Sequence, residues 1–274
     1  MFDTVIEMLS YPFMTRAFLV GSLVALCSAL LGVSLVLKRY SMIGDGLSHV
    51  GFGAMAIAAA MNAAPLTVAI PVVIVAAILL LRISGNAKIK GDAAIALIST
   101  TSLAVGVMVI SLTTGMNTDV YNYMFRSILA MSADDVKLSL VLSVFVLILF
   151  IVFYHKIFAI TFDETFARAT GVKAGVYNTL IAVLTAVTIV LGMRMMGALL
   201  ISSLIIFPAL TSMRVCRTFK SVIINAAIVS VVCLIAGVTL SYVAATPAGA
   251  SVVLANLVMM VLYTVVGAVK NHMR

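Results

Sequence analysis

Charged residues are scarce in this sequence. Asp, Glu, Lys and Arg together make up 9% of its 274 residues, 64% are hydrophobic, and the mean hydropathy is +1.27. A typical soluble globular domain has about 25% charged residues, most of them on its surface. The composition therefore excludes a soluble domain and indicates an integral membrane protein.

Segments in which apolar and polar residues alternate are also missing, and a β-barrel needs them because its strands face lipid and lumen in turn. Runs such as LSLVLSVFVLILFIVFY (138–154) are apolar on every face, as in membrane helices. We expect an all-α, polytopic protein with a single transmembrane domain over 1–274. It has eight or nine spans, since 193–213 can be one broken segment. The candidates are 17–37, 43–61, 66–82, 93–113, 137–154, 174–193, 195–213, 221–244 and 248–269.

Cysteines are few, and two sequence signatures of enzymes are absent. Cys27, Cys216 and Cys233 are isolated in or beside apolar segments, so we expect neither a disulfide nor a cysteine-rich metal site. The sequence contains no GxxxxGK[ST] nucleotide-binding loop and no HExxH zinc motif. We therefore predict no catalytic residue, and any ATP hydrolysis must come from a partner.

The basic residues are unevenly distributed along the chain. Of the 17 Lys and Arg, 13 lie in alternate breaks between the candidate spans, at 38–39, 82–90, 156–173, 214–220 and 270–274. The positive-inside rule places these breaks and the C-terminus in the cytoplasm. This bias, together with anionic lipid headgroups, accounts for the net charge of +8, so no nucleic-acid partner is expected.

One acidic residue falls inside a candidate span. Asp45, in SMIGDGLSHVGFGA (41–54), is the only one of the nine acids that the expected boundaries place there. His49 follows four residues later, on the same helix face. A carboxylate and an imidazole at this spacing suit one first-row divalent cation. The spacing is equally compatible with a helix cap, or with an ion pair between Asp45 and Lys38 or Arg39.

Small residues surround this pair. Gly44, Gly46, Ser48 and Gly53 lie in the same segment. They can line a pathway or allow neighbouring helices to pack closely, and close packing is the commoner role of such residues.

A short helix at about 161–172 is predicted on the basic side. Asp163 suits its N-cap, Glu164 and Arg168 stand four residues apart on one face, and Gly171 suits its end. A capped helix between two spans has the form of a docking element.

The segment GDGLSHVGFGA (44–54) resembles the GDAxSHAxxPG signature of the permeases of bacterial ATP-binding-cassette importers for manganese, zinc and iron, the ABC-3 family. Gly46 replaces the usual Ala, and the Pro after the His is absent. Further blocks resemble the family in order: KGDAAIALISTTSLAVG (90–106), DVYNYMFRSIL (119–129), FDETFARATGV (162–172), GALLISSLIIFPALTSMRV (197–215) and TPAGASVVL (246–254).

The resemblance implies a homodimer in the bacterial cytoplasmic membrane, packed on two cytoplasmic ATP-binding subunits. A metal-binding lipoprotein or periplasmic protein supplies the ion from outside. Asp45 and His49 of both copies would line a transient site for the transported divalent metal, and no permanent cofactor is implied. The 161–172 helix would couple to the ATPase. Its buried contacts would be Phe162, Phe166 and Ala167, and Glu164 and Arg168 would form a polar rim.

Three other classes stay open. A secondary transporter can use Asp45 and His49 as a proton relay, although the sequence holds no second copy of the pair. A membrane metalloenzyme needs more ligands, and His155 and His272 lie in breaks on the basic side. A structural membrane subunit fits if Asp45 only caps a helix.

Overall fold

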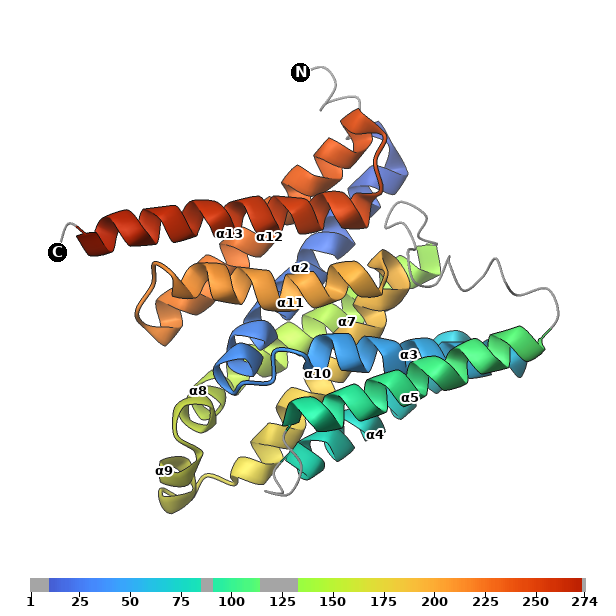
Figure 1. Ribbon diagram of the computed structural model, residues 1–274, viewed down its shortest axis with the longest axis horizontal. Helices are drawn as coiled ribbons and strands as arrows, with labels where there is room; N and C mark the ends of the chain where they lie inside the picture. The colour runs from blue at the N-terminus through green and yellow to red at the C-terminus, as the bar shows by residue number, and fades with distance from the viewer. Residues whose placement is uncertain (1–9, 85–90, 114–132, 273–274) are drawn as a thin grey trace.

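The computed structural model describes residues 10–84, 91–113 and 133–272, and these ranges are helical with short connections (Figure 1). The block at 119–129 lies outside the described residues. The helices are α2 (Pro12–Leu37), α3 (Ile43–Ala60), α4 (Pro65–Ser84), α5 (Gly91–Leu112), α7 (Ala133–Val152), α8 (Tyr154–Phe162), α9 (Glu164–Ala169), α10 (Ala174–Met196), α11 (Ala198–Met213), α12 (Phe219–Ala244) and α13 (Ala248–His272).

The number of spans agrees with the expectation of eight or nine. Within the described ranges, seven helices are long and apolar enough to cross a membrane, and the pair α7–α8, bent by 68°, forms an eighth candidate. The apolar α11 is shorter, with 16 residues. Gly197 separates it from α10 with a φ of 84°, a left-handed conformation that glycine adopts without strain. The structure therefore resolves what the sequence leaves open at 193–213: α10 ends at Met196, and α11 begins at Ala198.

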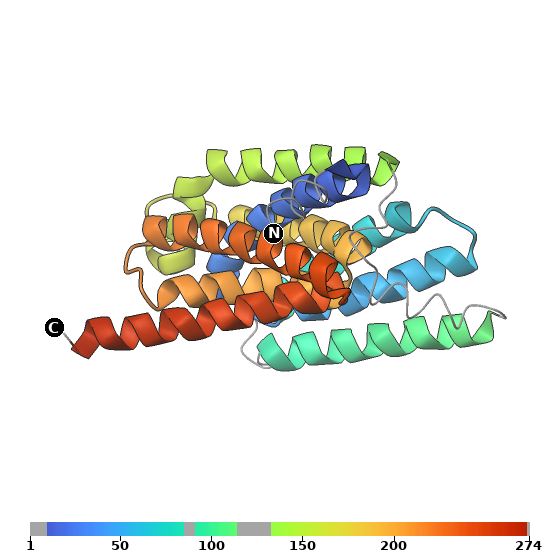
Figure 2. The same cartoon turned by 90° about the horizontal axis from the view of Figure 1, so that it is seen from above.

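α2 and α10 run through the middle of the bundle, between α13 on one side and the α3–α4–α5 group on the other (Figure 1). α3 packs most closely on α5 and α4, whereas α2 packs on α11 and α12. In the view from above, α7 and α5 lie at opposite faces (Figure 2). α3 is thus enclosed by α4, α5, α10 and α11 for most of its length.

Some buried hydroxyl groups are satisfied within their own helices, although those of Ser34, Ser139, Thr185 and Thr211 have no hydrogen-bond partner among the described residues. Ser28 donates to the Val24 carbonyl at 2.7 Å, and Thr188 donates to the Leu184 carbonyl at 2.8 Å. This i−4 bonding satisfies the hydroxyl donors of these two residues in a medium without water. Polar residues inside the spans are therefore compatible with the membrane.

Several breaks that carry the basic residues meet at one end of the molecule. α8, α9, the turn between α11 and α12 and the end of α13 gather at the left of Figure 1. The breaks at 156–173 and 214–220 and the end of α13 thus lie at one end of the molecule, and the assignment of this end to the cytoplasm stays a prediction.

Candidate functional site

Asp45 and His49 lie on one face of α3, as their spacing predicts. His49 Nε2 is 3.6 Å from Asp45 Oδ2, and the side chains are 21% and 46% exposed, respectively. Asp45 is the only acid within the candidate spans of the described residues. The two side chains therefore present an oxygen and a nitrogen on a partly open surface.

The structure disfavours the two alternatives for Asp45. The N-cap of α3 is Met42, and no side chain caps this helix. Lys38 pairs with Glu164, and the ion pair of Asp45 among the described residues is with His49. Asp45 thus neither caps the helix nor neutralises the basic turn before it.

The small residues of α3 are used for close packing. A Cβ at Gly46 would lie 2.6 Å from the Ile95 side chain of α5, and one at Gly53 would lie 2.6 Å from the Ser102 carbonyl oxygen. A Cβ at Gly44 would lie 3.1 Å from the Ile205 side chain of α11. Larger residues would push α5 and α11 away from the helix that carries Asp45 and His49.

Two further polar residues border the pair. The Ser48 hydroxyl is buried and donates to the Gly44 carbonyl at 2.7 Å, so it does not reach the open surface that the pair presents. Ser202 of α11 interacts with the Asp45 carboxylate. Ser202 was not predicted from the sequence, because a serine in an apolar run carries no signal of its own.

One chain supplies an incomplete ligand set. No group of three or more His, Cys, Asp or Glu side chains is close enough to hold a metal within 10–84, 91–113 and 133–272. First-row divalent cations bound by protein side chains usually have four or more ligands. A cation at Asp45 and His49 therefore needs ligands from water or from a second chain.

The docking element differs in detail from the helix expected at 161–172. Two helices meet at Asp163, which ends α8 and caps α9, its Oδ1 accepting from the Phe166 N–H at 2.8 Å. Glu164 and Arg168 form the expected ion pair at 2.6 Å. α9 ends at Ala169, and Gly171 follows with a φ of 85°. The cap, the pair and the glycine stop are confirmed, whereas the expected bounds 161–172 are too wide, because Phe162 and the residue before it belong to α8.

Aromatic side chains form the exposed face of this element. Phe162 and Phe166 are 59% and 65% exposed, while Ala167 is 1% exposed and belongs to the core of the chain. The expectation that Ala167 lies on the contacting surface is therefore wrong, because α9 turns this residue inward. Phe162 also packs against Phe158 and Phe219, with ring centroids 5.0 and 5.6 Å away. A supported, exposed aromatic face of this kind fits a protein partner.

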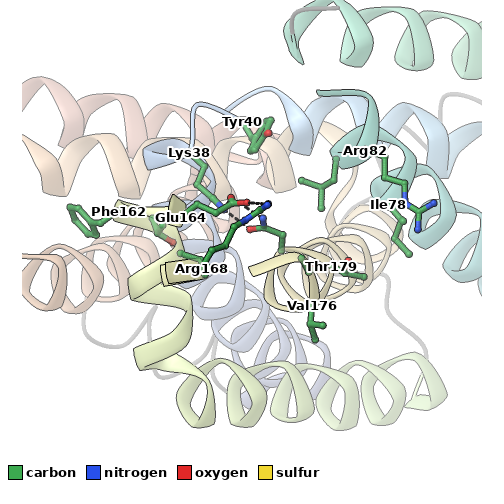
Figure 3. A pocket seen from close by; sticks show the side chains of 14 residues that line it. Lys38, Tyr40, Ile78, Arg82, Phe162, Glu164, Arg168, Val176 and Thr179 are labelled. Carbon is green, nitrogen blue, oxygen red and sulfur yellow. Dashed lines mark hydrogen bonds and ion pairs between the residues drawn. The ribbon is translucent and has the colours of Figure 1, made fainter. Parts of the chain in front are cut away.

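A cavity of about 1000 Å³ lies behind α9, between the ends of α2 and α4 and the start of α10 (Figure 3). Glu164 lies in its wall and accepts hydrogen bonds from Arg168 and Asn178, at 2.6 and 2.9 Å. Lys38 approaches the same carboxylate at 3.5 Å and also donates to Asn178. Four side chains from three elements thus form one network.

The charges in this network are mutually stabilised. Burial opposes ionisation of Glu164, yet hydrogen bonds from Asn178 and Arg168 and the charge of Lys38 hold the pKa of its carboxyl below its usual value. Burial lowers the pKa of the Lys38 amine, and the charge of Glu164 counteracts this. Lys38 and Asn178 were not predicted as partners of Glu164, because they lie 126 and 14 residues from it.

Known proteins share this architecture. The sequence model of the ABC 3 transport family matches residues 10–267. The chain is 27% identical over 248 residues to the manganese transport system membrane protein MntC of Halalkalibacterium halodurans, covering 90% of this chain and 85% of that protein. It is 30% identical over 246 residues to the high-affinity zinc uptake system membrane protein ZnuB of Haemophilus influenzae, covering 90% and 94%.

Its structure resembles that of PsaBC from Streptococcus pneumoniae in complex with Fab. The TM-score is 0.85 at 26% identity, and the match covers 95% of this chain and 94% of that one. Sequence and structure agree over nearly the whole length, and the chain belongs to the ABC 3 transport family.

Proposed function

We propose that this chain is the membrane-spanning subunit of an ATP-driven importer of divalent transition-metal ions in the bacterial cytoplasmic membrane. The observation that carries this proposal is the pair Asp45 and His49, an oxygen and a nitrogen donor on one face of a membrane helix. Membership of the ABC 3 transport family supports the ATP-driven mechanism. The relatives named for manganese and zinc transport support the class of ion.

The metal site is formed by two copies of the chain. Each copy offers two donors, and two copies related by a two-fold axis offer four. Oxygen and imidazole nitrogen suit Mn²⁺, Zn²⁺ and Fe²⁺, and the absence of a cysteine ligand argues against a copper(I) site. The ion is cargo, so the site binds it only transiently and releases it after each cycle.

The ATP-binding subunits dock at the end of the molecule that carries α8 and α9. Phe162 and Phe166 provide the exposed apolar contacts, and Asp163 keeps α9 helical by capping it. The positive-inside rule assigns this end and the C-terminus to the cytoplasm. The two ATP-binding subunits hydrolyse ATP, and an extracytoplasmic binding protein delivers the ion to the opposite end.

A secondary transporter is the second candidate, because Asp45 and His49 can also carry protons. It differs in its energy source, since ion or proton gradients would replace ATP. Membership of the ABC 3 transport family favours the ATP-driven importer.

Uptake by cells tests the proposal. Cells with the complete operon, with this gene deleted, and with the gene restored are given radiolabelled Mn²⁺, Zn²⁺ and Fe²⁺ in turn. We expect the deletion to abolish high-affinity uptake of at least one metal, and the restored gene to recover it. Uptake that survives ATP depletion but stops when the proton gradient is removed would favour the secondary transporter.

Docking of the ATP-binding subunit is tested separately. Replacing Phe162 and Phe166 together by Ala removes most of the exposed aromatic area, so we expect less ATPase to copurify with the permease. Val176→Ala is the matched control, because Val176 is 60% exposed near the same end but lies outside the aromatic face. Equal ATPase recovery with the double variant and the control would move the docking site elsewhere.

A further inference from the structure

Glu164 lies on α9, the docking helix of the proposed function, where a contact with the ATP-binding subunit was expected. Its carboxylate instead contacts other residues of this chain. Its carboxylate is one-third exposed and accepts from Asn178 and Arg168, with Lys38 at 3.5 Å (Figure 3). Each carboxylate oxygen is already engaged by at least one donor. Glu164 therefore joins α9 to α10 and to the end of α2.

Lys38 is the residue through which this network reaches α2. Its side chain is 12% exposed, and it both approaches Glu164 and donates to Asn178. An ion pair shielded from water in this way interacts more strongly than an exposed one. The ion pair can therefore keep α9 attached to the end of α2 while α9 moves.

The turn after Lys38 leads directly to the start of α3, the helix that carries Asp45 and His49, the metal pair. The Tyr40 N–H donates to the Leu35 carbonyl at 2.8 Å, and the Ile43 N–H donates to the Tyr40 carbonyl at 3.1 Å. Arg39 has a φ of 62°, the left-handed conformation that closes a helix in such a turn. Asp45 lies in the first turn of α3, so the hydrogen-bonded segment from Lys38 to Asp45 can move as one unit.

The Lys38–Glu164 pair gives the docking helix α9 a direct connection to this unit, and α9 also reaches it indirectly through α8 and α10, which contact α2 and α3. α9 packs on α8 and α10, and the cavity separates it from α4, whose Arg82 and Ile78 line the opposite wall (Figure 3). Tyr40 lines the same cavity, and the charge of Glu164 contributes, after burial, to raising the pKa of its hydroxyl. Among the described residues, Lys38–Glu164 is the ion pair between α9 and the end of α2.

We propose that Lys38 and Glu164 link the docking helix to the metal pair, so that movement of α9 against the ATP-binding subunit is transmitted through the 38–42 turn to Asp45. This inference rests on the proposed function. Both are positioning residues, since neither contacts the ion or ATP. The link explains how a displacement at the cytoplasmic end reaches the metal site without passing through the lipid-facing helices.

The test measures coupling in the complete complex, reconstituted in lipid with its ATP-binding subunits and binding protein. Glu164→Gln and Lys38→Met each remove the ion pair and keep side-chain volume. We expect the number of metal ions transported per ATP hydrolysed to fall about fivefold or more, the factor that about 1 kcal/mol makes in an equilibrium. The exchanged pair, Lys38→Glu with Glu164→Lys, should recover part of this ratio.

Arg82→Gln is the matched control, because it removes a positive charge from the same cavity without touching the ion pair. It should keep the wild-type ratio. An unchanged ratio in Glu164→Gln and Lys38→Met would overturn the link. Loss of the ATP-binding subunit from either variant would also overturn it, because Glu164 would then be a docking contact.

A spin label in the 38–42 turn detects movement of this turn without a measurement of transport. Met42 is 50% exposed, so Met42→Cys can be labelled once Cys27, Cys216 and Cys233 are replaced. ATP should change the spectrum in the otherwise unchanged complex but not with Glu164→Gln. The same ATP-induced change in both would refute the link. Absence of metal uptake by the wild-type complex would instead refute the proposed function, and the label would still report whether ATP moves the turn.

Discussion

Gly32 gives a sharp test of the helix packing that supports the metal pair. A Cβ at this position of α2 would lie 2.1 Å from the carbonyl oxygen of Ile205 and 2.9 Å from its carbonyl carbon. Both are backbone atoms of α11, so no change of side-chain rotamer can relieve the contact. Gly32→Ala therefore forces α2 and α11 apart by roughly 1 Å, and such overpacking typically costs about 1–3 kcal/mol.

Gly175→Ala is the matched control for this substitution. It makes the same chemical change in α10, where nothing lies within 4 Å of the added carbon. Alanine in the middle of a helix is more stable than glycine by about 0.5–1 kcal/mol. Gly175 is the second residue of α10, so this variant should be unchanged or slightly stabilised. Gly32→Ala should therefore lower the free energy of unfolding, whereas Gly175→Ala should leave it unchanged or raise it.

The assay is thermal unfolding of the purified permease in one detergent. For a protein of this size, 1 kcal/mol corresponds to about 2–4 °C in Tm. We expect Gly32→Ala to lower Tm by several degrees and Gly175→Ala to leave it unchanged or raise it. A Tm for Gly32→Ala equal to or above that of Gly175→Ala would show that α2 and α11 do not pack as described.

Three further predictions concern topology, assembly and pH. A reporter fused after Arg274 should be cytoplasmic and one inserted at Asn62, in the turn after α3, should be external; both on one side would mean that the span count is wrong. Met61 is 70% exposed at the end of α3, so in a cysteine-free background Met61→Cys should cross-link to the same residue of a second copy of this chain. Cross-linking only to a different polypeptide would indicate a heterodimeric pore. The pKa of Glu164 in the folded chain is below the usual pKa of a glutamate, so the ionised carboxylate stabilises the fold at pH values above that usual pKa. This stabilisation is lost as the pH falls through the lowered pKa. The Tm difference between wild type and Glu164→Gln should thus be present at pH 7 and shrink below about pH 4; a constant difference would contradict this.

Most of the fold could be predicted because the spans are set by local composition. Each apolar run between polar breaks became a helix, and the glycine at 197 marks the break that the sequence left open. The bend between α7 and α8 was not predicted, since Val152 and Tyr154 flank it without any proline or glycine. Apolar residues on both sides make the two helices look like one run.

The site was predicted only where its residues are close in sequence. Asp45 and His49 share a helix face by their spacing, and Asp163 caps α9 by its position before it. Lys38 and Glu164 are 126 residues apart, and a basic residue in a break could equally face lipid headgroups or solvent. They come together because the packing of α9 on α8 and α10 places Glu164 beside the end of α2. Their role therefore depends on tertiary structure, which periodicity and composition do not specify.

ATP-dependent metal uptake by the reconstituted complex tests the central claim most directly. Proteoliposomes containing this chain, its ATP-binding subunit and its binding protein are compared with complexes that carry Asp45→Asn or His49→Ala. The account predicts uptake of a divalent metal by the wild type that requires ATP, and a loss of most of it in both variants while the complexes assemble in normal amounts. Wild-type rates of metal uptake in both variants would contradict the account.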